Sequence, residues 1–241
     1  MTPLLELKNI ATAYGASQVL FGISLEVHAR EVVTLIGRNG MGKSTTVKTI
    51  MGMLAPGKGV VRMAGNDLVG QPSHKVALSG IGLVPEGRRV FPNLTVRENL
   101  VATANNRHKA ARPWTLDTVY EMFPRLKERE RNLGANLSGG EQQMLAIGRA
   151  LMTNPKLLIL DEATEGLAPI IRAEIWSCLQ RLKDAGLALI VIDKNIGPLL
   201  RLADRHYVVE KGRVVWSGNS EMLRANPQVL RVCGSLTKSM K

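Results

Sequence analysis

The chain has 241 residues, a formal net charge of +12 at pH 7, a hydrophobic fraction of 45% and two cysteines. This length suits one domain or at most two, and the apolar fraction is sufficient for a buried core. The sequence has no apolar run near the roughly 18 residues that a membrane span needs, no signal-peptide pattern and no cysteine spacing typical of a metal site or disulfide framework, so we expect a chain that does not itself cross a membrane and that suits a reducing compartment.

Short apolar runs alternate with helical patterns along most of the chain. We expect strands over residues 4–10, 24–27, 31–36, 59–63, 157–160 and 187–192, and a hairpin of residues 206–210 and 213–217. Helical patterns cover residues 43–53, 96–104, 115–123, 139–153, 170–184 and 196–203. This alternation predicts an α/β fold with a mainly parallel sheet and helices on both faces. The tail after Gly234 is expected to be loosely tethered.

A glycine-rich segment, GRNGMGKST, lies between an expected strand and an expected helix. Its spacing is that of a phosphate-binding loop, in which backbone N–H groups must converge on phosphate oxygens, and glycine allows that close approach. The Lys43 ammonium would reach the β and γ phosphates, and the Ser44 hydroxyl would ligate Mg²⁺. The candidate nucleotide-binding residues here are Gly37, Arg38, Asn39, Gly40, Met41, Gly42, Lys43, Ser44 and Thr45.

Two carboxylates directly follow the apolar run LLIL at residues 157–160. Four consecutive apolar residues are typical of a strand that is covered on both faces. The carboxyl end of such a strand is where open α/β sheets bind ligands. Asp161 would therefore hold Mg²⁺ through water, and Glu162 would be the catalytic group that orients and polarises the attacking water.

A third motif, LSGGEQQ, precedes another expected helix. A helix N-terminus presents unpaired N–H donors and a partial positive charge, which favour an anion. The three motifs, in this order, resemble those of ABC transporter ATP-binding subunits, and the resemblance covers nearly the whole chain. It implies that Ser138, Gly139, Gly140 and Glu141 contact the γ phosphate of ATP bound to an opposite subunit, so that two subunits together form two composite sites.

The same resemblance implies a P-loop NTPase fold of the ABC ATPase type, with a mainly parallel sheet core, an antiparallel β subdomain and a helical insert. It implies a single ABC ATPase domain over residues 1–241, with a core of residues 1–84 and 155–241 and a helical subdomain of residues 85–154. ATP and Mg²⁺ are the implied ligands, and ATP hydrolysis is the implied activity.

Four single positions take family roles by resemblance. Tyr14 falls where an aromatic ring stacks on adenine. Glu86 stands where most members have a glutamine that senses Mg²⁺, and a carboxylate can also ligate this cation. Ala168 replaces a common aspartate. Lys194 replaces a histidine that hydrogen-bonds the γ phosphate; the lysine either contacts that phosphate as a point charge or is a surface residue, and both interpretations stay open.

Three segments, residues 83–100, 141–152 and 165–170, closely resemble one of the two ATPases of branched-chain amino acid importers. This implies an ATP-hydrolysing subunit for import of branched-chain or related hydrophobic amino acids, peripheral at the cytoplasmic face of the inner membrane. Its partners would be transmembrane permease subunits that dock near residues 86–91, a second and non-identical ATPase subunit and, indirectly, a solute-binding protein. Importers of urea or short amides and lipid exporters have similar ATPases, so the cargo stays open.

The net charge of +12 has three interpretations. For nucleic acid, the basic residues are too dispersed and the aromatic residues too few to form a stacking platform. A nucleic-acid-associated member of the family would usually have two cassettes or a coiled-coil insertion, so we expect no nucleic-acid partner. Proximity to an anionic membrane surface and a generally basic surface both explain the charge.

Overall fold

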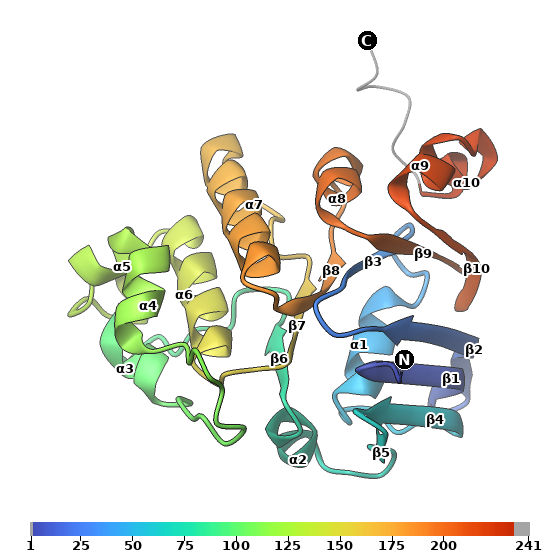
Figure 1. The fold of residues 1–241 in the computed structure, drawn as a ribbon, viewed down its shortest axis with the longest axis horizontal. Coiled ribbons are helices and arrows are strands. Elements are labelled where there is room, and N and C mark those ends of the chain that lie inside the picture. Colours follow the sequence, from blue (N-terminus) through green and yellow to red (C-terminus); the bar gives the residue numbers. More distant parts are fainter. Residues whose placement is uncertain (1, 234–241) are drawn as a thin grey trace.

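The structure, a computed structural model, describes residues 2–233 and consists of two β-sheets with helices around them (Figure 1). Six strands form one sheet, in the order β10 (Arg213–Gly218), β9 (Arg205–Glu210), β3 (Val32–Ile36), β8 (Ala188–Ile192), β7 (Leu157–Asp161) and β6 (Ile81–Val84). Four strands form the other, in the order β2 (Ser17–Val27), β1 (Leu5–Tyr14), β4 (Lys58–Met63) and β5 (Asn66–Asp67). The tail after Gly234 lies outside the described residues.

The six-stranded sheet is mainly parallel. β6, β7, β8, β3 and β9 run parallel to one another, and β10 pairs with β9 in the antiparallel direction. Every residue of β3, β7 and β8 is buried, because both faces of this sheet are covered. The four-stranded sheet is antiparallel. The predicted fold class, with a parallel core, an antiparallel sheet and a helical insert, is therefore confirmed.

Helices cover both faces of the parallel sheet. One face packs against α1 (Lys43–Ile50), α2 (Ser73–Leu78) and the four-stranded sheet. The other face packs against α6 (Gly139–Leu151), α7 (Pro169–Asp184) and α8 (Ile196–Leu202). The remaining helices are α3 (Val96–Val101), α4 (Leu116–Met122), α5 (Pro124–Glu128), α9 (Ser220–Arg224) and α10 (Pro227–Val232), with a 3₁₀ turn at Gly134–Asn136. Within residues 2–233, no helix combines the length and the apolar character that a membrane crossing requires.

The insert between β6 and β7 contains α3 to α6, which gather on the left of Figure 1. Two of these helices, α3 and α6, begin at capping boxes that contain a glutamate, formed by Thr95 with Glu98 and by Ser138 with Glu141. In each box the hydroxyl accepts a backbone N–H, and the carboxylate accepts the N–H of the capping residue. The cap at Ser138 fixes where the LSGGEQQ segment turns into a helix.

Several elements differ from the sequence-based expectation. β1 and β2 are longer than predicted, because their pairing contains register irregularities that interrupt the period-two pattern of burial. α1 ends at Ile50 rather than three residues later, since Gly52 adopts a φ of 65° that ends the helix. β6, α2, α5, α9 and α10 were not predicted, and each has at most six residues, which is too short for a clear periodic signal.

A buried histidine connects β9 to β3. The Nδ1 of His206 lies 2.6 Å from the Oγ1 of Thr34, and its Nε2 lies 2.8 Å from the Oγ of Ser220. Because the Ser220 hydroxyl donates to the carbonyl of Leu200, it accepts from Nε2–H, and the ring is the neutral Nε2–H tautomer. Burial, followed by the nearby Arg224, lowers the pKa of His206 to about 4.

We predict that His206 makes the fold acid-sensitive. An unfolded histidine titrates near pH ~6.5, so the unfolded chain binds more protons than the folded chain between that value and about 4. Stability contributed by neutral His206 is present above pH ~6.5 and is lost as the pH falls, by about 2 kcal/mol at pH ~5. Chemical unfolding of wild type and His206→Gln at several pH values measures this difference.

The matched control is His74→Gln, because His74 is exposed on α2. This variant should keep the wild-type dependence of unfolding free energy on pH. A His206→Gln protein with the same acid sensitivity as wild type would contradict the assignment.

Candidate functional site

The glycine-rich loop lies between β3 and α1, at the carboxyl end of the parallel sheet. Gly40 and Gly42 have φ of 77° and 103°, which favour glycine. A Cβ on Gly42 would lie 2.8 Å from the Cδ2 of Leu20. The ammonium of Lys43 donates to the carbonyls of Gly37 and Arg38 at 2.8 and 2.9 Å. The lysine therefore folds back over the loop, and burial lowers its pKa despite the nearby carboxylates of the site.

β9 and the turn that follows it also contact the phosphate loop. A Cβ on Gly37 would lie 2.3 Å from the carbonyl oxygen of Val209 on β9. The carbonyl of Met41 accepts a hydrogen bond of 3.0 Å from the N–H of Gly212, in the turn between β9 and β10. The partly buried side chain of Met41 packs against the core cluster that includes the four-stranded sheet. These contacts anchor the loop against β9 and the turn between β9 and β10.

Asp161 ends β7 and faces the start of α1. The Ser44 hydroxyl donates to its Oδ1 at 3.4 Å. Burial raises the pKa of Asp161; the Ser44 hydroxyl acts in the opposite direction, and the carboxylate of Glu86 adds to the increase. A buried carboxylate beside a hydroxyl and a second carboxylate is a set of oxygen donors that suits a hard cation such as Mg²⁺.

Glu162, the next residue, is held in a left-handed conformation with φ of 53°. Its N–H donates to the carbonyl of Ile192, the last residue of β8. Its carboxylate lies 3.3 Å from the ammonium of Lys194. Burial, followed by the neighbouring Glu165 carboxyl, raises the pKa of Glu162 to about 7. A carboxylate with such a pKa can accept a proton near neutral pH.

Lys194 contacts two carboxylates at once. Its ammonium donates to Glu165 as well as pairing with Glu162. The hydrogen bond with Glu165 is the main reason that the pKa of Lys194 is raised. Glu165 was not predicted as a site residue. Its partner Lys194 is 29 positions away, and nothing in the sequence indicates that the two side chains meet.

A polar cavity of about 400 Å³ brings these groups together. Its lining includes three carboxylates whose oxygens lie within 4.8 Å of one another, those of Glu86, Glu162 and Glu165. The cavity is lined by Val19, Asn39, Gly40, Gly42, Lys43, Ser44, Thr45, Glu86, Glu162, Glu165 and Lys194. The cavity thus lies between the phosphate loop and the segments that follow β6, β7 and β8, which contribute Glu86, Glu162 with Glu165, and Lys194.

A second network supports this arrangement and was also missed. The hydroxyl of Thr164 donates to Oδ2 of Asp193 at 2.5 Å, and the side chain of Asn195 donates to Oδ1 at 2.6 Å. It connects the segment after β7 to the segment after β8, which carry Glu162 and Lys194. The position of Asp193 directly after an apolar strand, like that of Asp161, was the available signal.

Nine candidates do not line the cavity. Four of them belong to the elements that border it: Gly37, Arg38 and Met41 lie in the phosphate loop, and Asp161 ends β7. The other five lie on other elements. Tyr14 lies at the end of β1, 44% exposed, with the Lys48 ammonium 5.7 Å from its ring centre. The other four, Ser138, Gly139, Gly140 and Glu141, lie at the start of α6. In Figure 1, α6 and α1 lie on opposite sides of β6 and β7. The LSGGEQQ segment therefore does not line the cavity formed by the phosphate loop of the same chain.

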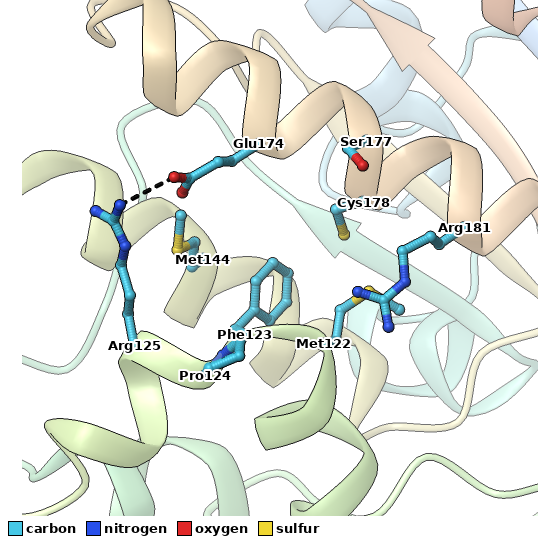
Figure 2. Close-up of a pocket in the computed structure, with 9 residues that line it drawn as sticks. All are labelled: Met122, Phe123, Pro124, Arg125, Met144, Glu174, Ser177, Cys178 and Arg181. Atoms are coloured by element: carbon cyan, nitrogen blue, oxygen red, sulfur yellow. Dashed lines mark hydrogen bonds and ion pairs between the residues drawn. The ribbon is translucent and has the colours of Figure 1, made fainter.

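Another cavity, of about 340 Å³, separates α7 from α4, α5 and α6 (Figure 2). It is lined by Met122, Phe123, Pro124, Arg125, Met144, Glu174, Ser177, Cys178 and Arg181. The Arg125 guanidinium pairs with Glu174 at 3.0 Å at its edge, and burial raises the pKa of the Cys178 thiol to about 12. This cavity has no loop of converging N–H donors, so the polar cavity is the candidate nucleotide site.

Comparison with known proteins agrees with this geometry. The family model described as "ABC transporter" matches residues 20–165. The high-affinity branched-chain amino acid transport ATP-binding protein BraG of Pseudomonas aeruginosa is 46% identical, over 94% of this chain and 97% of BraG. The lipopolysaccharide export system ATP-binding protein LptB of Haemophilus influenzae is 34% identical, over 95% of this chain and 96% of LptB.

Among solved structures, the ADP conformation of MJ1267, an ATP-binding cassette of an ABC transporter, superposes with a TM-score of 0.82 at 25% identity. That superposition covers 96% of this chain and 98% of MJ1267. A structure of the ATP-binding subunit of an ABC transporter gives a TM-score of 0.80 at 28% identity, over 96% of this chain and 95% of the other.

Proposed function

The chain belongs to the ABC transporter family and is an ATP-binding ATPase subunit, and on that premise we propose that it energises an importer of branched-chain amino acids. The observation that carries the choice of cargo is the 46% identity with BraG over nearly the full length of both chains. The resemblance of residues 83–100, 141–152 and 165–170 to such importer ATPases points the same way.

In this proposal the phosphate loop binds ATP. The backbone of residues 37–42 and the ammonium of Lys43 contact the β and γ phosphates, for which Lys43 already lies across the loop. Ser44 binds Mg²⁺ directly, with Asp161 through water and Glu86 close by. When bound, Mg²⁺ supplies charge neutralisation for the phosphate oxygens. Tyr14 is proposed to stack on adenine.

Glu162 is proposed as the catalytic base. It directly follows Asp161, the proposed cation ligand, and it lines the cavity. Its pKa of about 7 suits a group that accepts a proton near neutral pH. Lys194 is proposed to leave its two carboxylates and contact the γ phosphate, since its ammonium already lines the same cavity. The pair of Lys194 with Glu165 is exposed on both sides, at 48% and 45%. An exposed ion pair stabilises a protein by at most about 1 kcal/mol, so a phosphate can compete with Glu165 for the lysine.

The second half of the proposal concerns partners. Ser138, Gly139, Gly140 and Glu141 lie away from the chain's own cavity, so we propose that they serve the nucleotide of a second, non-identical ATPase subunit. Residues 85–154 act as a helical subdomain on a core of residues 1–84 and 155–241. Permease subunits dock near residues 86–91 at the cytoplasmic face of the inner membrane, and a solute-binding protein takes part indirectly.

A lipid exporter is the second candidate, favoured by the 34% identity with LptB over 95% of this chain. The identity with BraG is higher, which is why import is preferred. Purification of the tagged chain in detergent, with identification of bound subunits by mass spectrometry, separates the two. We expect permease subunits of an amino acid importer and a second ATPase. Recovery of lipid-export membrane subunits instead would contradict the proposal.

Glu162→Gln is predicted to lower the ATP hydrolysis rate of the assembled transporter by about 10²- to 10⁴-fold, because the amide cannot accept a proton. ATP binding should persist, since the phosphate loop is unchanged. Phosphate release and nucleotide-binding fluorescence measure the two effects. Glu221→Gln, an exposed position on α9, is the control and should match wild type. A Glu162→Gln rate within about threefold of wild type would exclude Glu162 as the base.

Lys194→Ala is predicted to weaken ATP binding or slow hydrolysis by about tenfold, the effect of losing one charge-assisted contact. ADP binding should not change, because ADP has no γ phosphate. Lys156→Ala is the matched control, since Lys156 is exposed just before β7, at the opposite end of that strand. An unchanged ATPase rate in the assembled transporter would show that Lys194 is only a surface residue.

A further inference from the structure

Residues 86–91, between β6 and α3, contain an unusual turn. Gly87, Arg88 and Arg89 have φ of 80°, 65° and 48°. Side chains larger than glycine avoid this left-handed region, so two successive arginines in it need contacts that hold the turn in place.

Helices α3 and α6 provide those contacts. The guanidinium of Arg149 on α6 donates to the carbonyl of Arg89 and lies 4.5 Å from the ring centre of Phe91. The buried side chain of Asn99 on α3 accepts from the N–H of Phe91 at 2.8 Å and donates to its carbonyl at 3.0 Å. The backbone of the turn is thereby fixed, and with it the direction in which the Arg88 side chain leaves it.

The Arg88 side chain lies against Gly139, the first residue of α6. A Cβ on Gly139 would lie 2.7 Å from Nη1 of Arg88 and 2.9 Å from its Cζ. The same guanidinium lies 3.9 Å from where a Cβ on Gly166 would be, in the segment between β7 and α7. Glycine at position 139 is therefore what allows the guanidinium to cover the start of the helix.

The Arg88 guanidinium has no carboxylate at ion-pair distance among the described residues. At the start of α6, the Ser138 hydroxyl accepts the N–H of Glu141, while the N–H groups of Gly139 and Gly140 have no partner within the helix. A cation beside the positive end of a helix is unfavourable alone and becomes favourable when an anion binds to both.

We infer that Arg88 is a further residue of the half-site that this chain donates, and that its guanidinium contacts the γ phosphate of ATP held by the opposite ATPase subunit. The inference rests on the proposed composite sites. Arg88 then acts on the opposite nucleotide, whereas Lys43 and Glu162 act on the chain's own. A planar guanidinium offers paired donors that match phosphate oxygens.

The test uses the assembled transporter, purified in detergent through a tag on this chain. Radiolabelled 8-azido-ATP is trapped with vanadate and photo-crosslinked, and the label on each ATPase subunit is measured after separation. If the assembly holds two copies of this chain, copies of different size are co-expressed and only one carries the substitution.

Four variants are compared. Arg88→Gly removes the guanidinium and suits a position with φ of 65°, and Arg88→Lys keeps the charge without the planar donors. Ser138→Ala tests the half-site itself. Arg97→Ala, an exposed arginine on α3, is the control. Thermal unfolding of each variant checks that the fold is retained.

Arg88→Gly is expected to lower the label on the opposite subunit at least about tenfold, the effect of one charge-assisted contact, and to leave the label on the substituted chain unchanged. Arg88→Lys should retain more label than Arg88→Gly, and Arg97→Ala should match wild type. Loss of label from the substituted chain instead would overturn the inference.

The Ser138→Ala variant distinguishes a wrong role for Arg88 from a wrong composite site. If Ser138→Ala lowers the opposite label and Arg88→Gly does not, the role of Arg88 is wrong while the composite site stands. If neither variant changes the opposite label, the proposed composite site fails as well.

Discussion

The site depends on the register in which the buried parallel strands β3, β8 and β7 end together. Asp161 pairs with Ile192, so the residues that follow each strand emerge at the same edge of the sheet. Because β3 lies beside β8 in the same sheet, the phosphate loop leaves at this edge as well. The Ser44 to Asp161 hydrogen bond joins residues 117 positions apart and results from this register. A shift of one residue would turn these carboxylates to the opposite face.

Much of this arrangement could be predicted, because the motifs are local. The spacing of glycines with Lys43 and Ser44, and the carboxylates after an apolar run, are properties of short segments. The contacts of Lys194 with Glu165, and of Arg88 with Gly139, could not be predicted, since they join segments distant in sequence through the detailed path of turns. The two interpretations of Lys194 were left open for the same reason. Short elements such as β6 were missed because four residues carry no periodicity.

Two surfaces of the chain differ in charge: the polar cavity and the start of α6. Its own cavity is rich in carboxylates, which suit a cation and a catalytic base. The start of α6 offers unpaired N–H groups and an arginine, which suit an anion. The turn from Glu86 to Arg88 lies between them, with one end on the cavity lining and the other against Gly139. Movement of the helical insert would therefore change both surfaces together.

The claim that one chain holds only half of each site is tested most directly by ATP hydrolysis as a function of subunit concentration. The rate per chain is measured for the purified chain over a wide range of dilution and again in the assembled transporter. The account predicts a rate per chain near zero in dilute solution of the purified chain and a restored rate in the assembly. A high rate per chain that persists unchanged on dilution of the purified chain would contradict it.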